Sequence, residues 1–159
     1  MVIVVISILV YVSLRAFQPK EAIALQQAER LRNDLRHIQM LALTWNRALR
    51  LTVVGGGASY EVCCLDAAMA ACLPNAPVPP APCAVPSPVR DPATGLPYSI
   101  ALEPGLVLAG PVFSLNFDAM GRPKNGANLI AANATFTITG AGSLRTVTVA
   151  PVTGFATAQ

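Results

Sequence analysis

Charged residues are scarce in this sequence. Only 12% of its 159 residues are Asp, Glu, Lys or Arg, whereas an ordinary soluble domain has about 25%. Hydrophobic residues make up 53% of the chain, and aromatic residues only 6%. A chain of this composition is expected to sit in apolar or crowded surroundings.

The groups that enzymes and metal centres use are also few. There is one histidine, His37, and the acidic residues after position 50 are scattered singly. The cysteines form no Cys-x-x-Cys pair, and the glycine triplet at 55–57 lacks the lysine and following helix of a phosphate-binding loop. Asp118 and Gly121 favour a turn at the end of a strand, with a calcium ligand as the weaker alternative. We therefore expect no enzyme, and no catalytic, cofactor-binding or metal-binding residue.

A hydrophobic run of membrane-spanning length is missing too. The apolar stretch at residues 2–14 is shorter than the about 20 residues that a single span needs. No basic stretch precedes it and no small-residue cleavage site follows it, which argues against a signal peptide. We favour a third interpretation, in which the recorded start falls inside a longer apolar helix. The apolar side chains of the run are Val2, Ile3, Val4, Val5, Ile6, Ile8, Leu9, Val10, Val12 and Leu14.

The next residues carry the pattern of an amphipathic helix, because apolar residues recur at alternating steps of four and three. We expect a helix over residues 1–50, kinked near Pro19. Residues 1–17 would lie in a membrane or fibre core, and residues 18–50 would pack on the rest of the chain. Seven Lys or Arg against three Asp or Glu in this half indicate a solvated basic face, and we expect no nucleic-acid partner. The expected seam is Ala24, Ala28, Leu31, Leu35, Ile38, Ala42, Trp45 and Leu49.

After residue 50 the pattern becomes that of strands. Nine of the fourteen prolines fall within residues 74–97, which predicts a surface loop. In segment 112–118, Phe113, Leu115 and Phe117 alternate with polar or smaller residues, so one face of that strand is core. The expected fold is α+β, a long N-terminal helix packed on an antiparallel β domain at residues 51–159. Strands are expected on both sides of the glycine triplet and at 98–103, 106–109, 112–118, 134–139, 144–150 and 152–156.

The four cysteines, Cys63, Cys64, Cys72 and Cys83, flank or lie in the proline-rich loop. Disulfides that tie this loop are favoured over a metal site or free core thiols. Three pairings exist. Adjacent strand residues point to opposite faces, so Cys63 and Cys64 are not expected to pair with each other.

Three segments resemble the type IV pilin family. Residues 2–14 are similar to the interior of the apolar helix with which such pilins begin. Residues 117–123 (FDAMGRP) resemble the F-D-x-x-G-R-P segment of H-class minor pseudopilins, and residues 145–154 resemble that class's R-x-V-x-V-x-P-x-T-G ending. The middle of the chain is most similar to the C-type minor pilin of the mannose-sensitive haemagglutinin (MSHA) system. The matching residues are Phe117, Asp118, Gly121, Arg122, Pro123, Arg145, Pro151 and Gly154.

Two departures from the family pattern matter. The family's basic leader, cleavage-site glycine and early acidic residue are absent, so the chain resembles an N-terminally truncated member. Cleavage by a prepilin peptidase, and the methylation associated with it, would need a natural chain that begins earlier. Pro19 also lies about one turn later than the family's usual helix proline, which would displace the kink.

The resemblance implies a minor pilin or pseudopilin, a structural subunit in assembly of an MSHA-type type IV pilus. A minor pseudopilin of type II protein secretion is the alternative. The implied partners are other pilin or pseudopilin subunits, and the inner membrane before assembly. The implied location is the bacterial inner membrane, as a single-pass protein with a periplasmic β domain, and then the fibre. A different class also stays open: a membrane-tethered β domain that binds a ligand and never polymerises.

Overall fold

The computed structural model describes residues 20–65, 89, 91, 94–111, 114–140 and 142–159. Its helix, α2, runs over Lys20–Trp45, 26 residues or about 39 Å. The apolar run at residues 2–14 and the kink expected near Pro19 lie outside the described residues. Within the described part, no helix has the length and apolarity needed to cross a bilayer.

The seam of α2 forms the centre of the core. Its first six expected members, from Ala24 to Ala42, are fully buried, and Trp45 is partly buried. Leu49 is buried too, but the prediction that it belongs to the helix is wrong, because it begins strand β1. The helix ends at Trp45 since Asn46 adopts a positive φ of 51°, which asparagine tolerates at helix ends. The next turn is closed by a hydrogen bond from the Arg47 N–H to the Ala42 carbonyl at 3.1 Å.

The antiparallel β domain that the sequence predicted consists of two sheets, and both pack on this helix. The first sheet has strand order β3-β2-β1-β5-β6-β7, and the second has order β10-β9-β8-β4. The first comprises β1 (Leu49–Val54), β2 (Ser59–Cys64), β3 (Ser99–Ala101), β5 (Leu115–Phe117), β6 (Pro123–Asn125) and β7 (Asn128–Leu129). The second comprises β4 (Val107–Ala109), β8 (Ala134–Gly140), β9 (Ser143–Val149) and β10 (Ala156–Ala158). A short 3-10 turn, η1 (Gly55–Gly57), joins β1 to β2.

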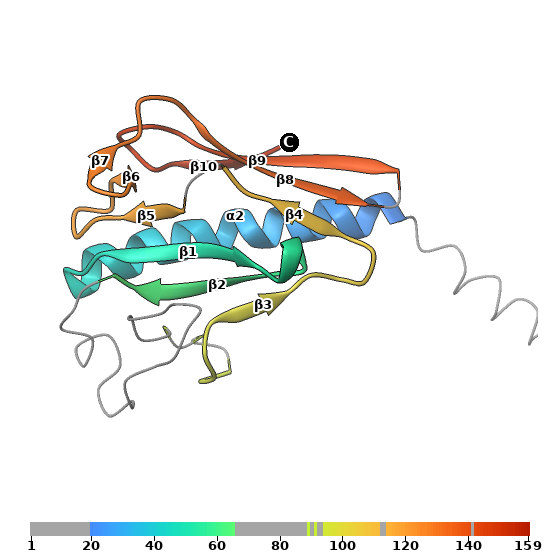
Figure 1. The fold of residues 1–159 in the computed structure, drawn as a ribbon, viewed down its shortest axis with the longest axis horizontal. Helices are drawn as coiled ribbons and strands as arrows, with labels where there is room; N and C mark the ends of the chain where they lie inside the picture. The colour runs from blue at the N-terminus through green and yellow to red at the C-terminus, as the bar shows by residue number, and fades with distance from the viewer. Residues whose placement is uncertain (1–19, 66–88, 90, 92–93, 112–113, 141) are drawn as a thin grey trace, which may run out of the picture.

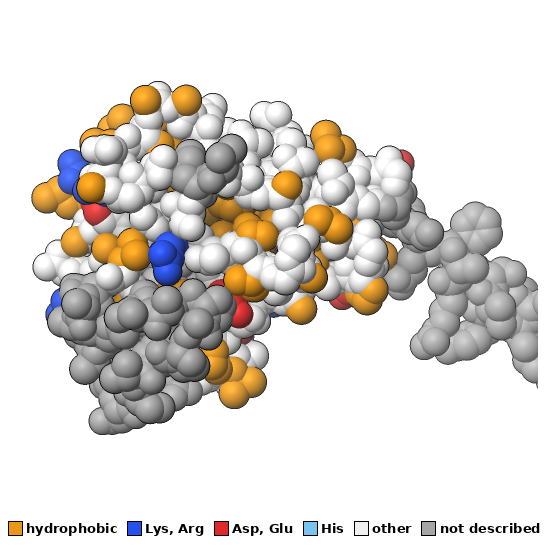
Figure 2. All heavy atoms as spheres, viewed as in Figure 1, with side chains coloured by type: hydrophobic (Ala, Val, Ile, Leu, Met, Phe, Trp, Pro, Cys, Tyr) orange, Lys and Arg blue, Asp and Glu red, His pale blue; other side chains and the backbone are white. Residues whose placement is uncertain are grey.

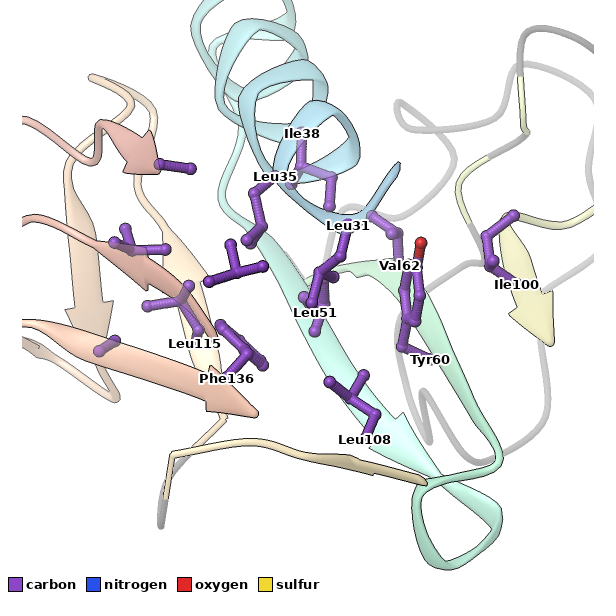
Figure 3. Packing of buried hydrophobic residues seen from close by; sticks show 14 of the residues in the cluster. Leu31, Leu35, Ile38, Leu51, Tyr60, Val62, Ile100, Leu108, Leu115 and Phe136 are labelled. Carbon is purple, nitrogen blue, oxygen red and sulfur yellow. The ribbon is translucent and has the colours of Figure 1, made fainter. Parts of the chain in front are cut away.

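The helix lies along both sheets (Figure 1), with most of its strand contacts on β9 and β10. Leu31, Leu35 and Ile38 point from α2 toward side chains of both sheets (Figure 3). The strand side of this core is supplied mainly by Leu51, Tyr60, Val62, Leu108, Leu115, Phe117, Phe136, Ile138, Val147 and Val149. The helix therefore joins the two sheets into one core, as an α+β fold requires.

Several strand expectations need correction. The predicted strand at 152–156 is wrong, because the chain turns between Ala150 and Gly154 before β10 begins. The short strands β6 and β7 were not expected, since their residues show no apolar alternation. In the segment 112–118, Leu115 and Phe117 are buried as expected, but Asn116 between them is buried as well, and Phe113 lies outside the described residues.

The proline-rich segment is only partly described. Val89, inside the predicted surface loop, is fully buried and lies between β2 and Tyr98. Its N–H donates to the Val62 carbonyl at 3.0 Å, and its carbonyl accepts from the Tyr98 N–H at 2.6 Å. Val89 is therefore held by β2 and Tyr98 and does not lie on the surface.

Candidate functional site

The turn between β5 and β6 is built around Asp118. One carboxylate oxygen, Oδ1, accepts the backbone N–H groups of Met120 and Arg122, both at 2.9 Å. The other, Oδ2, accepts the Arg122 side chain through Nε at 2.9 Å and Nη2 at 2.8 Å. Gly121 has a φ of +70°, which closes the turn in the left-handed region that glycine favours. The expected strand-ending turn is thus the structure found here.

These donors also set the protonation of Asp118, whose side chain is 14% exposed. Burial alone would raise its pKa. The backbone N–H groups of Arg122 and Met120 and the Arg122 guanidinium outweigh burial and hold the pKa of Asp118 below its usual value. The carboxylate therefore stays charged in this turn at neutral pH.

A second turn, at residues 150–154, precedes β10. The Thr153 N–H donates to the Pro151 carbonyl at 2.7 Å, and the Gly154 N–H donates to the Ala150 carbonyl at 3.0 Å. The first of these hydrogen bonds closes a three-residue γ-turn, and its central residue, Val152, has a φ of 68°. A γ-turn with positive φ at its centre is the rarer and more strained of the two forms.

Gln39 on α2 joins these two turns. Its side-chain amide nitrogen donates to the Gly121 carbonyl at 2.8 Å and to the Thr153 carbonyl at 2.6 Å. The amide has two hydrogens, so each turn receives one. Gly154 is the point of closest approach, because a Cβ there would lie 2.6 Å from Gln39 Nε2 and 3.1 Å from Phe117 Cε1. Two of the three segments that resemble pilins, residues 117–123 and 145–154, therefore meet on one helix residue.

Arg36, three residues earlier, holds the end of the chain. Its guanidinium donates to the Ala156 carbonyl through Nη2 at 2.8 Å and Nε at 3.2 Å. The same group lies over the Phe155 ring, with 4.4 Å from Cζ to the ring centre. We call this group of contacts, from Arg36 and Gln39 to the two turns, the helix–turn junction.

The opposite flank of α2 carries a second polar cluster. Asp34 accepts hydrogen bonds from the Tyr60 and Tyr98 hydroxyls, the latter at 2.9 Å. Burial, and then the Asp34 charge and hydrogen bond, raise the pKa of both tyrosines well above the usual value. His37 packs edge-on to Tyr98 with 6.2 Å between ring centres. This arrangement ties the helix to β2 and to Tyr98, the residue before β3.

Two hollows accompany these contacts. One, of about 180 Å³, lies between the sheets beside Thr52, Gly110 and Phe136. The other, of about 530 Å³, lies over the polar side of α2 beside Asp34 and Glu103. No group of three or more His, Cys, Asp or Glu suited to a metal ion occurs in the described part of the chain.

The cysteine prediction is only partly visible. Cys63 and Cys64 are fully buried on β2, where they face Arg50 and Leu49 of β1. Both take part in disulfide bonds. Cys72 and Cys83 lie outside the described residues, so the pairing stays a prediction.

The structure brings most of the family-like residues together. Phe117, Asp118, Gly121 and Gly154 meet at the helix–turn junction, and Pro151 opens its second turn. The neighbours of this group, Arg122 and Pro123, lead into β6. Arg145 belongs to β9, opposite Ile138, and is part of the sheet. Sequence reasoning missed Arg36 and Gln39. The sequence held no signal for either residue, because the pattern at 152–156 predicted a strand, and of the two turns only the one at Asp118 was expected.

No protein-family model and no curated protein matches the sequence. Solved structures do share its fold. The minor pseudopilin EpsH of the Vibrio cholerae type 2 secretion system superposes with a TM-score of 0.60 at 12% identity, over 86% of this chain and 96% of EpsH. The type IV minor pilin FimU of Pseudomonas aeruginosa gives 0.54 at 17% identity, over 85% of this chain and 86% of FimU. This chain therefore has the pilin-like fold of EpsH and FimU, an N-terminal helix packed against antiparallel sheets.

Proposed function

We propose that this chain is a structural subunit of a pilus or pseudopilus fibre, a minor pilin or minor pseudopilin. The observation that carries the proposal is the pilin-like fold itself, with a helix whose seam is already buried from Ala24 to Ala42. The chain's own sheets bury that seam. The apolar residues 2–14 precede it in sequence and would be buried against lipid or other subunits, at about 25 cal/mol per Å² of apolar area.

The finer assignment is to an MSHA-type type IV pilus, with the β domain in the periplasm before assembly and on the fibre afterwards. It rests on the residues of the cysteine-containing middle. A minor pseudopilin of a type II secretion system is the second candidate, favoured by the superposition on EpsH over 96% of that chain. In both, other pilin-like subunits are the partners, and a prepilin peptidase would act on a chain that begins earlier.

Cross-linking in living cells tests the fibre role. A photoreactive amino acid at Ile6 or Val10 of the full chain should yield adducts with other pilin-like subunits when the assembly machinery is present. The matched control is the same chain in cells without the assembly ATPase, where such adducts should be lost. Adducts with lipid alone in both strains would instead support a tethered binding module that never polymerises.

Deletion of the gene separates the two machines. A pilus subunit predicts loss of surface fibres and of adhesion with normal protein secretion. A pseudopilin predicts secreted enzymes trapped in the periplasm with surface fibres intact. The DNA upstream of the recorded start gives a further check, since a pilin requires an in-frame basic leader and a cleavage-site glycine.

A further inference from the structure

The helix–turn junction carries a group of exposed apolar side chains that the fold itself does not use. Met40 and Leu43 lie on the same face of α2 as Arg36, and Met120 flanks the Asp118 turn. Val152 and Phe155 flank the turn before β10. All five side chains are at least half exposed. We call this group the junction patch: Met40, Leu43, Met120, Val152 and Phe155.

Contacts within the junction make this a single surface. Leu43 lies against Gly121, next to Met120, because a Cβ on that glycine would be 3.0 Å from Leu43 Cγ. Gln39 reaches from the helix to Thr153, next to Val152, and Arg36 covers one face of the Phe155 ring. Contiguous exposed apolar side chains on one face mark an interaction site more often than single ones do.

Val152 supplies an independent observation. It is 61% exposed, so no core packing requires its side chain. Its φ of 68° is strained for a β-branched residue, and glycine or asparagine would suit this turn better. An exposed valine held in a strained turn is what a contact outside the chain would explain.

Charge and position indicate the occupant. Arg36, Arg122 and Lys124 edge the junction patch, against the single carboxylate of Asp118. A partner that carries a carboxylate beside its own apolar surface would complement this edge. Figure 2 shows hydrophobic and basic side chains together at the end of the molecule where β6 and β7 lie.

A membrane surface is the less favoured source of negative charge. Residues 36–43 lie about 24–35 Å along α2 from Lys20, where the described helix begins. If residues 1–19 enter the bilayer, the patch stands at the far end of the helix from it (Figure 1).

We propose that the junction patch is the docking surface for a neighbouring fibre subunit, which presents apolar side chains edged by a carboxylate. This inference rests on the proposed fibre function. It assigns to this chain the contact by which its β domain, in addition to its N-terminal helix, is held in the assembly.

Photo-cross-linking of the full chain in its own cells tests the proposal. A photoreactive amino acid at Met120 should give adducts with another pilin-like subunit, whereas one at Leu144 should not. Leu144 is the matched control because it is equally exposed but lies at the β8–β9 hairpin, away from the patch. No Met120 adduct, equal adducts at Leu144, or adducts with lipid alone would each overturn the proposal.

Substitutions at Val152 separate contact from stability. Val152→Asn should lower the Met120 adduct yield about tenfold, because the free energy gained by burying a valine side chain corresponds to about a tenfold change in affinity. The same variant should leave the melting temperature unchanged or raised, since asparagine tolerates positive φ. Val152→Thr keeps the shape and the strain, and should lower the yield through polarity alone. Wild-type yields from both variants would contradict the proposal.

Lys124→Glu tests the charged edge, with Lys124→Gln as its neutral counterpart. The adduct yield should fall further for the Glu variant than for the Gln variant. An unchanged yield in both would show that the basic edge does not attract the partner. Normal cross-links through Ile6 and Val10 without Met120 adducts would refute the docking surface alone. Loss of the Ile6 and Val10 cross-links would refute the fibre role itself.

Discussion

At the residue scale, Asp118 closes the β5–β6 turn, and Gln39 joins that turn and the one before β10 to the helix. The sequence predicted the first role but not the second. Asp118 could be assigned to a turn because a glycine follows three residues later. Gln39 looked like any polar residue on a helix flank, and its role depends on two turns 82 and 114 residues away. Local patterns carry no information on such distant partners.

The Asp118 turn should make stability sensitive to acid. Since its folded pKa is lowered, the carboxylate contributes stability that is present above the unfolded pKa of about 3.9 and lost as pH falls below it. Asp118→Ala should destabilise the full chain by about 2–3 kcal/mol at neutral pH, as loss of hydrogen bonds to a charged group predicts. Urea unfolding between neutral and acidic pH measures both effects.

Asp118→Asn is the matched control for this experiment. It keeps an oxygen for the two backbone donors, but it removes the charge and puts an NH2 donor where Oδ2 accepts the Arg122 side chain. It should therefore lower the free energy of unfolding less than the alanine variant does. It should also weaken the fall of that free energy with decreasing pH. If the free energy of unfolding falls as steeply with decreasing pH in Asp118→Asn as in the wild type, another carboxylate is responsible.

The tyrosines around Asp34 should resist ionisation. Burial and the Asp34 charge raise the pKa of Tyr60 and Tyr98, so both stay neutral in the folded chain above the usual tyrosine value of about 10. The two neutral hydroxyls therefore stabilise the fold fully below about pH 10, and this stabilisation is lost as the pH rises further. Ultraviolet absorbance against pH should show both ionising only with unfolding. Early ionisation of either in folded protein would contradict the hydrogen bonds to Asp34.

At the element scale, the helix was the part best predicted. Its seam of alternating steps is a strong signal, and six of the eight expected members are fully buried on α2. The pattern continued by coincidence into Leu49, because a buried strand position and a helix-seam position both require an apolar residue. The division into two sheets was not predictable, because strand alternation fixes which face is buried but not which strands pair. The segment before β10 was mistaken for a strand, since Val152 is β-branched yet lies in a turn.

Gly154 should be sensitive to any side chain. Gly154→Ala combines a φ of +69° with a Cβ only 2.6 Å from Gln39 Nε2. Gly142→Ala shares the strain, with a φ of +81°, but has nothing within 4 Å. The difference between the two variants isolates the close approach, and we expect Gly154→Ala to be about 1–3 kcal/mol less stable than Gly142→Ala. Equal melting temperatures would mean that the two turns are not packed against Gln39.

At the scale of the whole molecule, one helix serves both sheets and both ends of the described chain. The fold class followed from the sequence, because a helix pattern and a run of short strands allow few arrangements. Under the proposed fibre role, the choice between pilus and secretion system depends on the neighbouring subunits, and this chain would encode that choice only through surfaces such as the junction patch.

The disulfides should anchor the proline-rich segment to β2. We predict that Cys63 and Cys64 each bond to one of Cys72 and Cys83, which peptide mapping by mass spectrometry would show. Reduction should lower the free energy of unfolding by about 2–5 kcal/mol per bond. A peptide that contains a Cys63–Cys64 bond would contradict the pairing and the strand-face argument behind it.

The double attachment of the last strand to α2 has a mechanical consequence. Arg36 binds Ala156 and Gln39 binds Thr153, so under the proposed fibre role the last strand is fastened to the helix that would carry tension. A pull along that helix loads its contacts with β8, β9 and β10 in shear, where many must break together, instead of peeling them one at a time. The β domain is thus built to resist force directed along the axis of α2.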